Sequence, residues 1–318
     1  MSIRAMLCLA GLAGVVSASG AAVLTATGTI NLYGTSYPVS QWRTLGDAGT
    51  SAFDAEALTF YQGVLYASAD EGASAGNGRL VYYTPGPTGN LSSPSFYTTG
   101  TNGAFRWGGE GLTVNTSGSG YGSFGPGGFK LVSVDSRGDN ANGAVINVDD
   151  PGPVKSLSDI IPLPETDDVA WVGSRNQFAL LLDADGSIGW YDNAMNATGL
   201  SVPTFTEAKG LTVVSAGWAQ RVFGFSSMTS EVLMVVGKET NRLQFFDTNG
   251  VPLAPITALS PVGLNFAEIE GVAVDEANDL IYLADEAAIS IHVIQVPGPG
   301  AGVVLALAGL TTLRRRRD

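Results

Sequence analysis

Five short segments of this chain each begin with a polar or charged residue and continue as a short apolar run. Residues of this kind at one place in every copy of a repeat would meet at one point of the fold. Crowded carboxylates either rise in pKa or bind a hard cation such as calcium through oxygen ligands, and a lysine would offset part of their charge. The five leading residues are Glu56, Glu110, Asp168, Lys209 and Glu270.

A structural role is the alternative for these five residues. They would then cap inner strands and accept hydrogen bonds from backbone N–H groups of the neighbouring repeat.

Hydrolysis of a phosphate ester would require lysine or arginine beside the carboxylates to hold the phosphate. The single histidine, His292, lies on an alternating strand with no serine or cysteine nucleophile signature near it, which favours a structural role for it.

The elements that position these residues follow from the repeat. Its copies start 54, 58, 41 and 61 residues apart, and each contains a second apolar strand. A period of about 40–60 residues with about four strands a copy is typical of a β-propeller. The second strands are expected at 80–83, 131–135, 188–192, 243–247 and 291–294. The fourth copy carries a long insertion between its two matched strands.

Ring closure is the next expectation, because the last copy ends without room for a fourth strand. Residues 22–32 form an orphan strand that could fill this gap, since an open ring would expose unpaired strand edges. We therefore predict an all-β chain, a single β-propeller of five or six four-stranded blades. A sixth, degenerate blade would come from residues 33–52 or from the long insertion. The alternative fold is a β-sandwich.

Composition supports a turn-rich β protein and excludes several classes. The 318 residues include 42 Gly and 15 Pro, and only 14% are charged. One cysteine excludes a disulfide-stapled scaffold. A net charge of −13 argues against a nucleic-acid partner, which needs a basic face to neutralise phosphates.

The N-terminal segment, residues 1–21, has the layout of a secretory signal peptide, predicted as a helix. Arg4 supplies the positive start, residues 5–16 an apolar stretch, and small residues a cleavage site. Cys8 lies in this segment, so the exported domain, residues 22–296, is expected to contain no cysteine. Secretion machinery is therefore an expected partner.

The C-terminal segment, residues 297–318, combines a short proline motif, a hydrophobic helix and an arginine cluster. This layout resembles the PEP-CTERM sorting signal of bacterial exosortase substrates, with Gly298 where that family has glutamate. The apolar stretch 301–313 is shorter than the about 20 residues that span a bilayer, so flanking residues would have to contribute. The motif residues are Pro297, Gly298, Pro299, Arg314, Arg315, Arg316 and Arg317. The resemblance implies a Gram-negative-type bacterium, an exosortase-type sorting enzyme as a partner, and a membrane anchor.

The first and last repeats share more. Glu56-Ala-Leu-Thr-Phe followed by Val64-Leu-Tyr-Ala-Ser-Ala-Asp70 parallels Glu270-Gly-Val-Ala-Val followed by Leu280-Ile-Tyr-Leu-Ala-Asp285. This pattern resembles the phytase-like family of β-propellers over residues 50–295. The resemblance implies acidic residues at one face of the central channel and, in some relatives, calcium-dependent phosphate or ester hydrolysis. It implies calcium ligands at Glu56, Glu270, Asp70, Asp285 and Glu286.

We therefore expect an exported, surface-anchored β-propeller that serves as a binding or interaction module. It would lie in the bacterial cell envelope or extracellular matrix, with a polysaccharide or an envelope protein as partner. The alternative function is a calcium-dependent phytase-like phosphoesterase. Binding is favoured over enzymatic activity, because basic residues are few and scattered.

Overall fold

The computed structural model describes residues 24–43, 55–69, 79–91, 94–99, 109–123, 128–135, 143–184, 186–225, 230–238 and 241–296. The predicted signal helix and C-terminal hydrophobic helix, with the seven sorting-signal residues, lie outside these residues. None of the helices in the described part is long and apolar enough to cross a membrane.

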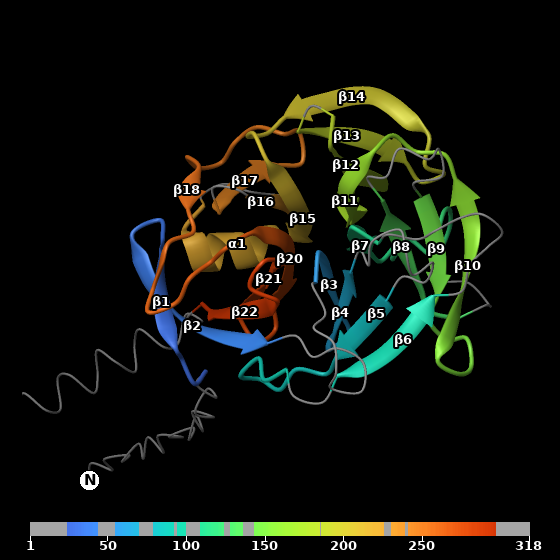
Figure 1. Ribbon diagram of the computed structural model, residues 1–318. Helices are drawn as coiled ribbons and strands as arrows, with labels where there is room; N and C mark the ends of the chain where they lie inside the picture. The colour runs from blue at the N-terminus through green and yellow to red at the C-terminus, as the bar shows by residue number, and fades with distance from the viewer. Residues whose placement is uncertain are drawn as a thin grey trace, which may run out of the picture.

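Antiparallel strands form five units arranged around a central axis (Figure 1). The first strand of each unit lies innermost, and these five strands contact one another in a closed circle. They are β3 (Ala57–Tyr61), β7 (Gly111–Thr113), β11 (Thr166–Val172), β15 (Ala208–Val214) and β20 (Ile269–Asp275). The fold is thus a five-bladed β-propeller, which confirms the predicted fold class and excludes the sandwich.

Blades 1 to 4 each take their four strands consecutively from the chain. Blade 1 continues from β3 with β4 (Val64–Ala69), β5 (Arg79–Tyr83) and β6 (Ser95–Thr99). Blade 2 continues from β7 with β8 (Lys130–Val134), β9 (Gly143–Asn147) and β10 (Val154–Ile161). Blade 3 continues from β11 with β12 (Gln177–Leu182), β13 (Ser187–Asp192) and β14 (Ala197–Pro203). Blade 4 continues from β15 with β16 (Val232–Gly237), β17 (Arg242–Asp247) and β18 (Thr257–Ala258). The outer strands β6 and β10 also pair in parallel, which joins blades 1 and 2.

Blade 5 is built from both ends of the chain, as ring closure predicts. Its three C-terminal strands are β20, β21 (Leu280–Asp285) and β22 (Ser290–Gln295). The fourth strand is β2 (Thr35–Arg43), which pairs antiparallel with β22. The described part of the predicted closing strand, residues 24–32, does not take this place. Strand β1 (Gly28–Leu32) lies one position further out, between β2 and the short β19 (Pro261–Val262).

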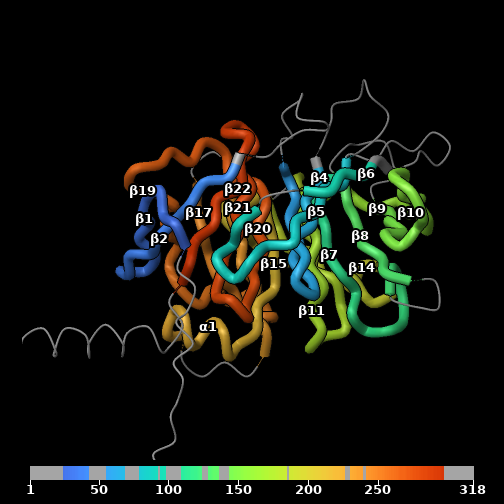
Figure 2. The backbone as a smooth tube through the Cα atoms, turned by 90° about the horizontal axis from the view of Figure 1, so that it is seen from below, coloured from blue at the N-terminus to red at the C-terminus, as the bar shows by residue number. Residues whose placement is uncertain are grey.

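The described parts of the segments considered for a sixth blade do not form one. Described residues 33–43 belong to the turn after β1 and to β2 in blade 5. The insertion in the fourth repeat includes α1 (Ala216–Phe223), which Ser215 caps by accepting a hydrogen bond from the Trp218 N–H. In Figure 2 the helix lies at one end of the ring, opposite the end at which β4 finishes. A short 3₁₀ helix, Gly173–Arg175, connects β11 to β12.

The second matched strands occupy the third position of their blades, with one exception. Residues 80–83, 188–192, 243–247 and 291–294 lie in β5, β13, β17 and β22. Residues 131–134 lie in β8, the second strand of blade 2. The match is displaced there because a long connection separates β7 from β8, so the spacing coincides with the wrong strand.

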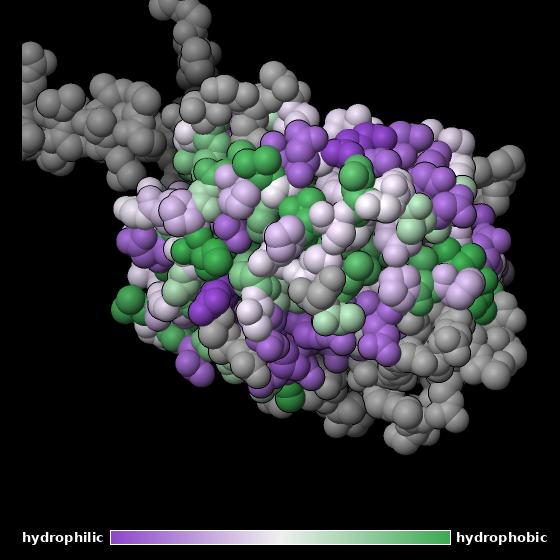
Figure 3. Space-filling model, turned by 90° about the horizontal axis from the view of Figure 1, so that it is seen from above, coloured by the Kyte–Doolittle hydropathy of each residue, from purple (hydrophilic) through white to green (hydrophobic). Residues whose placement is uncertain are grey.

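The core consists of apolar clusters between blades. Five clusters of buried side chains each join two neighbouring blades, one at every interface of the ring. Side chains on the two faces of a blade alternate between two clusters, as the strand period of 2 requires. Around the outer face in Figure 3, apolar side chains lie in small groups among polar ones.

Candidate functional site

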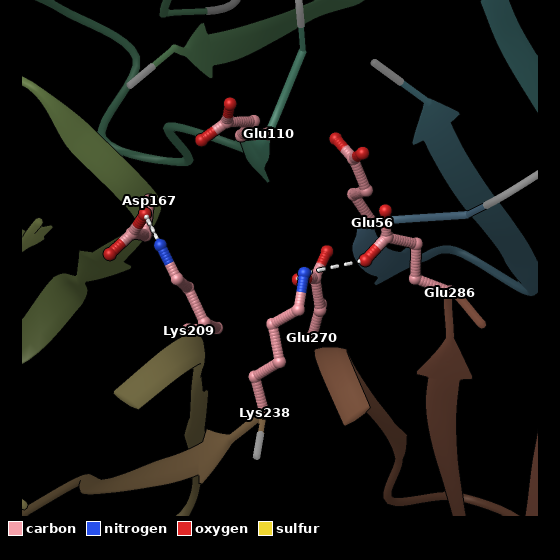
Figure 4. Close-up of a pocket in the computed structure, with 7 residues that line it drawn as sticks. All are labelled: Glu56, Glu110, Asp167, Lys209, Lys238, Glu270 and Glu286. Atoms are coloured by element: carbon pink, nitrogen blue, oxygen red, sulfur yellow. Dashed lines mark hydrogen bonds and ion pairs between the residues drawn. The ribbon is translucent and has the colours of Figure 1, made fainter. Parts of the chain in front are cut away.

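Charged side chains from all five blades converge on one cavity at the axis of the ring (Figure 4). The cavity encloses about 140 Å³. In blades 1 and 2 the lining residue directly precedes the inner strand, and in blades 3, 4 and 5 it is the second residue of that strand. The lining residues are Glu56, Glu110, Asp167, Lys209, Lys238, Glu270 and Glu286. Five carboxylates therefore face two ammonium groups, and Glu110 lies across the cavity from the lysines.

A β-bulge aims three of these side chains inward. In blades 3, 4 and 5 the pairing of the inner strand with its neighbour skips one residue, and the extra residue is Asp167 in β11, Lys209 in β15 and Glu270 in β20. A bulged residue leaves the regular alternation of faces, so its side chain can be redirected. The same local device thus serves three blades.

The prediction that Asp168 lines the cavity is wrong, because its neighbour Asp167 does so instead. The structure brings Asp167 to the cavity, whereas Asp168 is fully buried. The Asp168 carboxylate accepts hydrogen bonds from the backbone N–H of Leu211, at 2.6 Å, and of Val169, at 2.7 Å. It thereby binds the inner strand of the next blade. In pairing register Asp168 is equivalent to Gly210 and Gly271, one residue after the bulge.

Glycine at that following position lets neighbouring inner strands approach closely. A Cβ atom at Gly210 would clash with the carbonyl oxygen of Glu270, and one at Gly271 would clash with the carbonyl oxygen of Glu56. The chain therefore needs no side chain there. This close packing brings the cavity-lining residues of successive blades together.

Lys238 binds three glutamates at one side of the cavity. Its Nζ lies 2.6 Å from Glu270 Oε1, 2.7 Å from Glu286 Oε2 and 3.1 Å from Glu268 Oε2. Burial alone would lower the pKa of the half-buried lysine, but the hydrogen bonds and charges of these carboxylates raise it above its usual range. Lys238 is therefore a fixed counterion.

Lys209 is the counterion of two acids of blade 3, Asp167 and Asp183. Its Nζ lies 2.6 Å from Asp167 Oδ1 and 3.0 Å from Asp183 Oδ1. Burial raises the pKa of Asp167 to about 6, and the ion pair with Lys209 opposes that rise. The two lysines thus neutralise part of a charge that burial makes costly.

Glu270 also has a raised carboxyl pKa. Burial raises the pKa of Glu270 to about 7; the neighbouring Glu286 adds to the rise and Lys238 opposes it. The pKa of Glu286 is lowered: burial would raise it, but the contacts with Lys238 and the hydrogen bonds with Glu270 and Glu268 outweigh burial.

Three of the predicted calcium ligands lie close enough to share a cation. One carboxylate oxygen each of Glu56, Glu270 and Glu286 falls within 4.8 Å of the others. Carboxylate oxygens are the ligands that calcium prefers, so the donor set fits. Lys238 Nζ already binds Glu270 and Glu286, so a metal ion there would compete with an ammonium group of the protein itself.

Asp285 is not placed as a calcium ligand. It is fully buried, and its carboxylate pairs with His292 Nε2 at 2.9 Å. It also accepts hydrogen bonds from the N–H groups of Ala267, at 2.9 Å, and Glu268, at 3.1 Å. Burial would raise its pKa, but these hydrogen bonds lower it. Asp70, the remaining predicted ligand, lies outside the described residues.

Asp167 and Lys238 were missed as cavity residues, although the sequence holds a signal for each. Glutamate stands two residues before the bulged position in three blades, as Glu165-Thr-Asp167, Glu207-Ala-Lys209 and Glu268-Ile-Glu270. That spacing selects Asp167 over Asp168. Lys238 directly follows β16, at the place where Glu286 follows β21.

Backbone hydrogen bonds confirm that Lys238 and Glu286 are equivalent. The N–H of Lys238 donates to the Glu207 carbonyl, and the N–H of Glu286 donates to the Glu268 carbonyl. Blades 4 and 5 therefore each contribute two residues to the cavity. One comes from the inner strand and the other directly follows the second strand.

Comparison with known proteins agrees with the fold. The sequence matches no family model and no curated protein. The structure is similar to the crystal structure of Myxococcus xanthus glutaminyl cyclase, with a TM-score of 0.52 and 12% identity over 81% of this chain and 95% of that one. It is also similar to the Neurospora crassa Pan2 WD40 domain, with a TM-score of 0.46 and 8% identity over 87% of this chain and 98% of that one. At 12% identity the likeness to the glutaminyl cyclase shows the fold alone, a β-propeller.

Proposed function

We propose that this chain is an exported β-propeller that serves as a binding module, with the charged axial cavity as its ligand site. The observation that carries the proposal is the lining of that cavity, which consists entirely of charged side chains and has more carboxylates than lysines. A buried excess of carboxylate favours a cationic ligand group. Calcium or an ammonium group of a partner fits this chemistry.

Export and anchoring rest on the two ends of the chain. Residues 1–21 have the layout of a signal peptide, and residues 297–318 resemble a PEP-CTERM sorting signal. Secretion machinery and an exosortase-type enzyme would process them, leaving the domain 22–296 at the cell envelope or in the extracellular matrix. Its partner there would be a polysaccharide or an envelope protein.

A phytase-like, calcium-dependent phosphoesterase is the second candidate. It is favoured by the carboxylate oxygens of Glu56, Glu270 and Glu286, which lie within 4.8 Å of one another. The lysines favour binding instead. Both are held in ion pairs with carboxylates, so a phosphate group would have to displace those contacts. No arginine lines the cavity in the described part of the chain.

A calcium titration of matched variants tests the binding proposal. Lys238→Met removes the ammonium group that occupies the carboxylate cluster, so we expect this variant to bind calcium about tenfold or more tightly than wild type. Glu270→Gln removes the negative charge of one calcium-binding carboxylate, so adding it to Lys238→Met should abolish the gain in calcium affinity. Isothermal titration calorimetry measures the affinity.

Lys130→Met is the control, because Lys130 lies on β8 away from the cavity. Equal calcium affinities for Lys238→Met and Lys130→Met would contradict the cation site. Turnover of p-nitrophenyl phosphate that requires both calcium and Glu270 would support the phosphoesterase instead.

A further inference from the structure

A second cavity lies at the other end of the inner strands. It encloses about 180 Å³ and shares no lining residue with the acidic cavity. Whereas the acidic cavity lies where the inner strands begin, this one lies along their later residues. Its walls are residues 59–61, 112–114, 169–171 and 211–213, with Thr116 and Glu231.

Threonines from blades 1, 2 and 4 line this cavity because of the repeat. Thr59, Thr113 and Thr212 are the fourth residues of their repeats, three positions after Glu56, Glu110 and Lys209. The Thr113 hydroxyl oxygen accepts a hydrogen bond from the Trp171 backbone N–H at 3.0 Å. Each hydroxyl can both donate and accept a hydrogen bond, so these threonines suit a ligand that does the same.

Aromatic side chains supply an apolar part of the wall. Phe60, Tyr61 and Trp171 line the cavity, and Tyr61 is held by stacking on Phe129 with ring centroids 5.6 Å apart. Aromatic faces and edges beside hydroxyl groups suit a ring that has both C–H and O–H groups.

Trp171 also contributes a donor without an acceptor. Its side chain is 7% exposed, and its Nε1–H finds no hydrogen-bond partner among the described residues. A Cβ atom at Gly173 would lie 3.2 Å from Glu231 Oε1 and 3.7 Å from Trp171 Nε1, so both polar atoms lie near Gly173, and both of their residues line the cavity. A buried unpaired N–H is unfavourable, and a ligand oxygen would satisfy it.

We propose that this second cavity binds one sugar ring of a neutral saccharide. Among the described residues that line it, Glu231 alone is charged, so an anionic ligand would be repelled and a cationic one finds more carboxylates in the acidic cavity. A purely aliphatic ligand would leave the buried Trp171 indole N–H unpaired. The proposal does not depend on a ligand in the acidic cavity.

The volume limits the ligand to a single ring. Typical cavities for drug-sized ligands enclose about 300–1,000 Å³. At about 180 Å³ this cavity is smaller, which suits one ring at the end of a chain rather than an extended saccharide.

Indole NMR of the intact protein tests the proposal. Tryptophan side chains are labelled with ¹⁵N, and the Trp171→Phe variant assigns the Trp171 resonance. D-Glucose, D-galactose, D-mannose and N-acetyl-D-glucosamine are titrated separately, with D-glucuronate as the anionic control. We expect at least one neutral sugar to shift the Trp171 Nε1–H resonance saturably, and glucuronate to leave it in place.

Two matched variants separate sugar binding in the cavity from a general effect of removing a threonine hydroxyl from the protein. Thr212→Val removes one cavity hydroxyl and keeps the side-chain shape, so we expect the apparent affinity to fall about tenfold. Thr257→Val removes a hydroxyl from β18, outside the cavity, and should leave the affinity unchanged.

Three results would overturn the proposal. One is the absence of a saturable shift with any of the four neutral sugars. Another is an equal shift with glucuronate, and the third is an unchanged affinity in a folded Thr212→Val protein.

Discussion

Lys238 and Lys209 make a buried group of carboxylates tolerable. Removing a carboxylate from water is costly unless an opposite charge or hydrogen-bond donor replaces the solvent. Lys238 contacts three glutamates and Lys209 contacts two aspartates, so each lysine serves several acids. The cavity keeps a negative excess, which is what draws a cationic ligand.

Glu270 should make the stability of the protein depend on pH. Its pKa is raised from 4.5 to about 7 in the folded protein. Between these values the folded state holds a proton that the unfolded state has released, so the free energy of unfolding falls as pH rises through this window. We expect a loss of about 1 kcal/mol per pH unit from this group.

Urea unfolding of wild type and Glu270→Gln from pH 4.5 to pH 8 measures this effect. The variant, which cannot ionise at this position, should have a shallower dependence and be the more stable protein at pH 8. Parallel stability curves for the two proteins would show that Glu270 ionises with its ordinary pKa.

The inner strands of blades 4 and 5 share a feature of two residues. A bulge turns one side chain into the cavity, and glycine follows so that the next blade can pack against the backbone. Blade 3 replaces that glycine with Asp168, whose carboxylate binds the neighbouring backbone instead. Either solution holds adjacent inner strands together.

Alanine at Gly271 should therefore destabilise the protein. Its Cβ would clash with the carbonyl oxygen of Glu56, and overpacking of this kind costs about 1–3 kcal/mol. Gly217 in α1 is the control, because a Cβ there has no described atom within 4 Å and alanine favours the helix by up to about 1 kcal/mol. Thermal unfolding compares the variants; an equal effect at both positions would contradict the packing argument.

The ring is closed by hydrogen bonds between the two ends of the domain. Strand β2 pairs with β22 over five residue pairs, from Val39–Ile294 to Arg43–Ser290. Without β2, the edge of β22 would be unpaired, and the apolar cluster between blades 4 and 5 would lose Tyr37 and Val39.

A chain that lacks residues 24–43 should lose its cooperative thermal transition and bind the dye ANS. Adding a peptide of residues 24–43 in trans should restore the transition, because the peptide can pair with β22. A chain that lacks only residues 1–23 is the control and should melt as the full chain does. Cooperative melting without residues 24–43 would show that closure by β2 is dispensable.

The repeat and its periodicity were sufficient to predict most of the architecture. Apolar alternation and a regularly placed polar residue predicted a propeller, and the missing strand of the last blade predicted closure by the N-terminal segment. Glu56, Glu110, Lys209 and Glu270 were identified by their position in the repeat. They line the cavity because equivalent residues of a closed ring meet at its axis.

Register and ion pairing needed the tertiary structure. Asp167 and Asp168 are adjacent, and a shift of one residue exchanges the faces of a strand, so only the bulge decides which side chain reaches the cavity. Lys238 lies far in sequence from the glutamates Glu268, Glu270 and Glu286 that it binds. Its role follows from the packing of β16 beside β20, which no local pattern specifies. The sequence by itself determined that charges would gather at the axis, whereas the folded ring decided which acids they are and which lysines neutralise them.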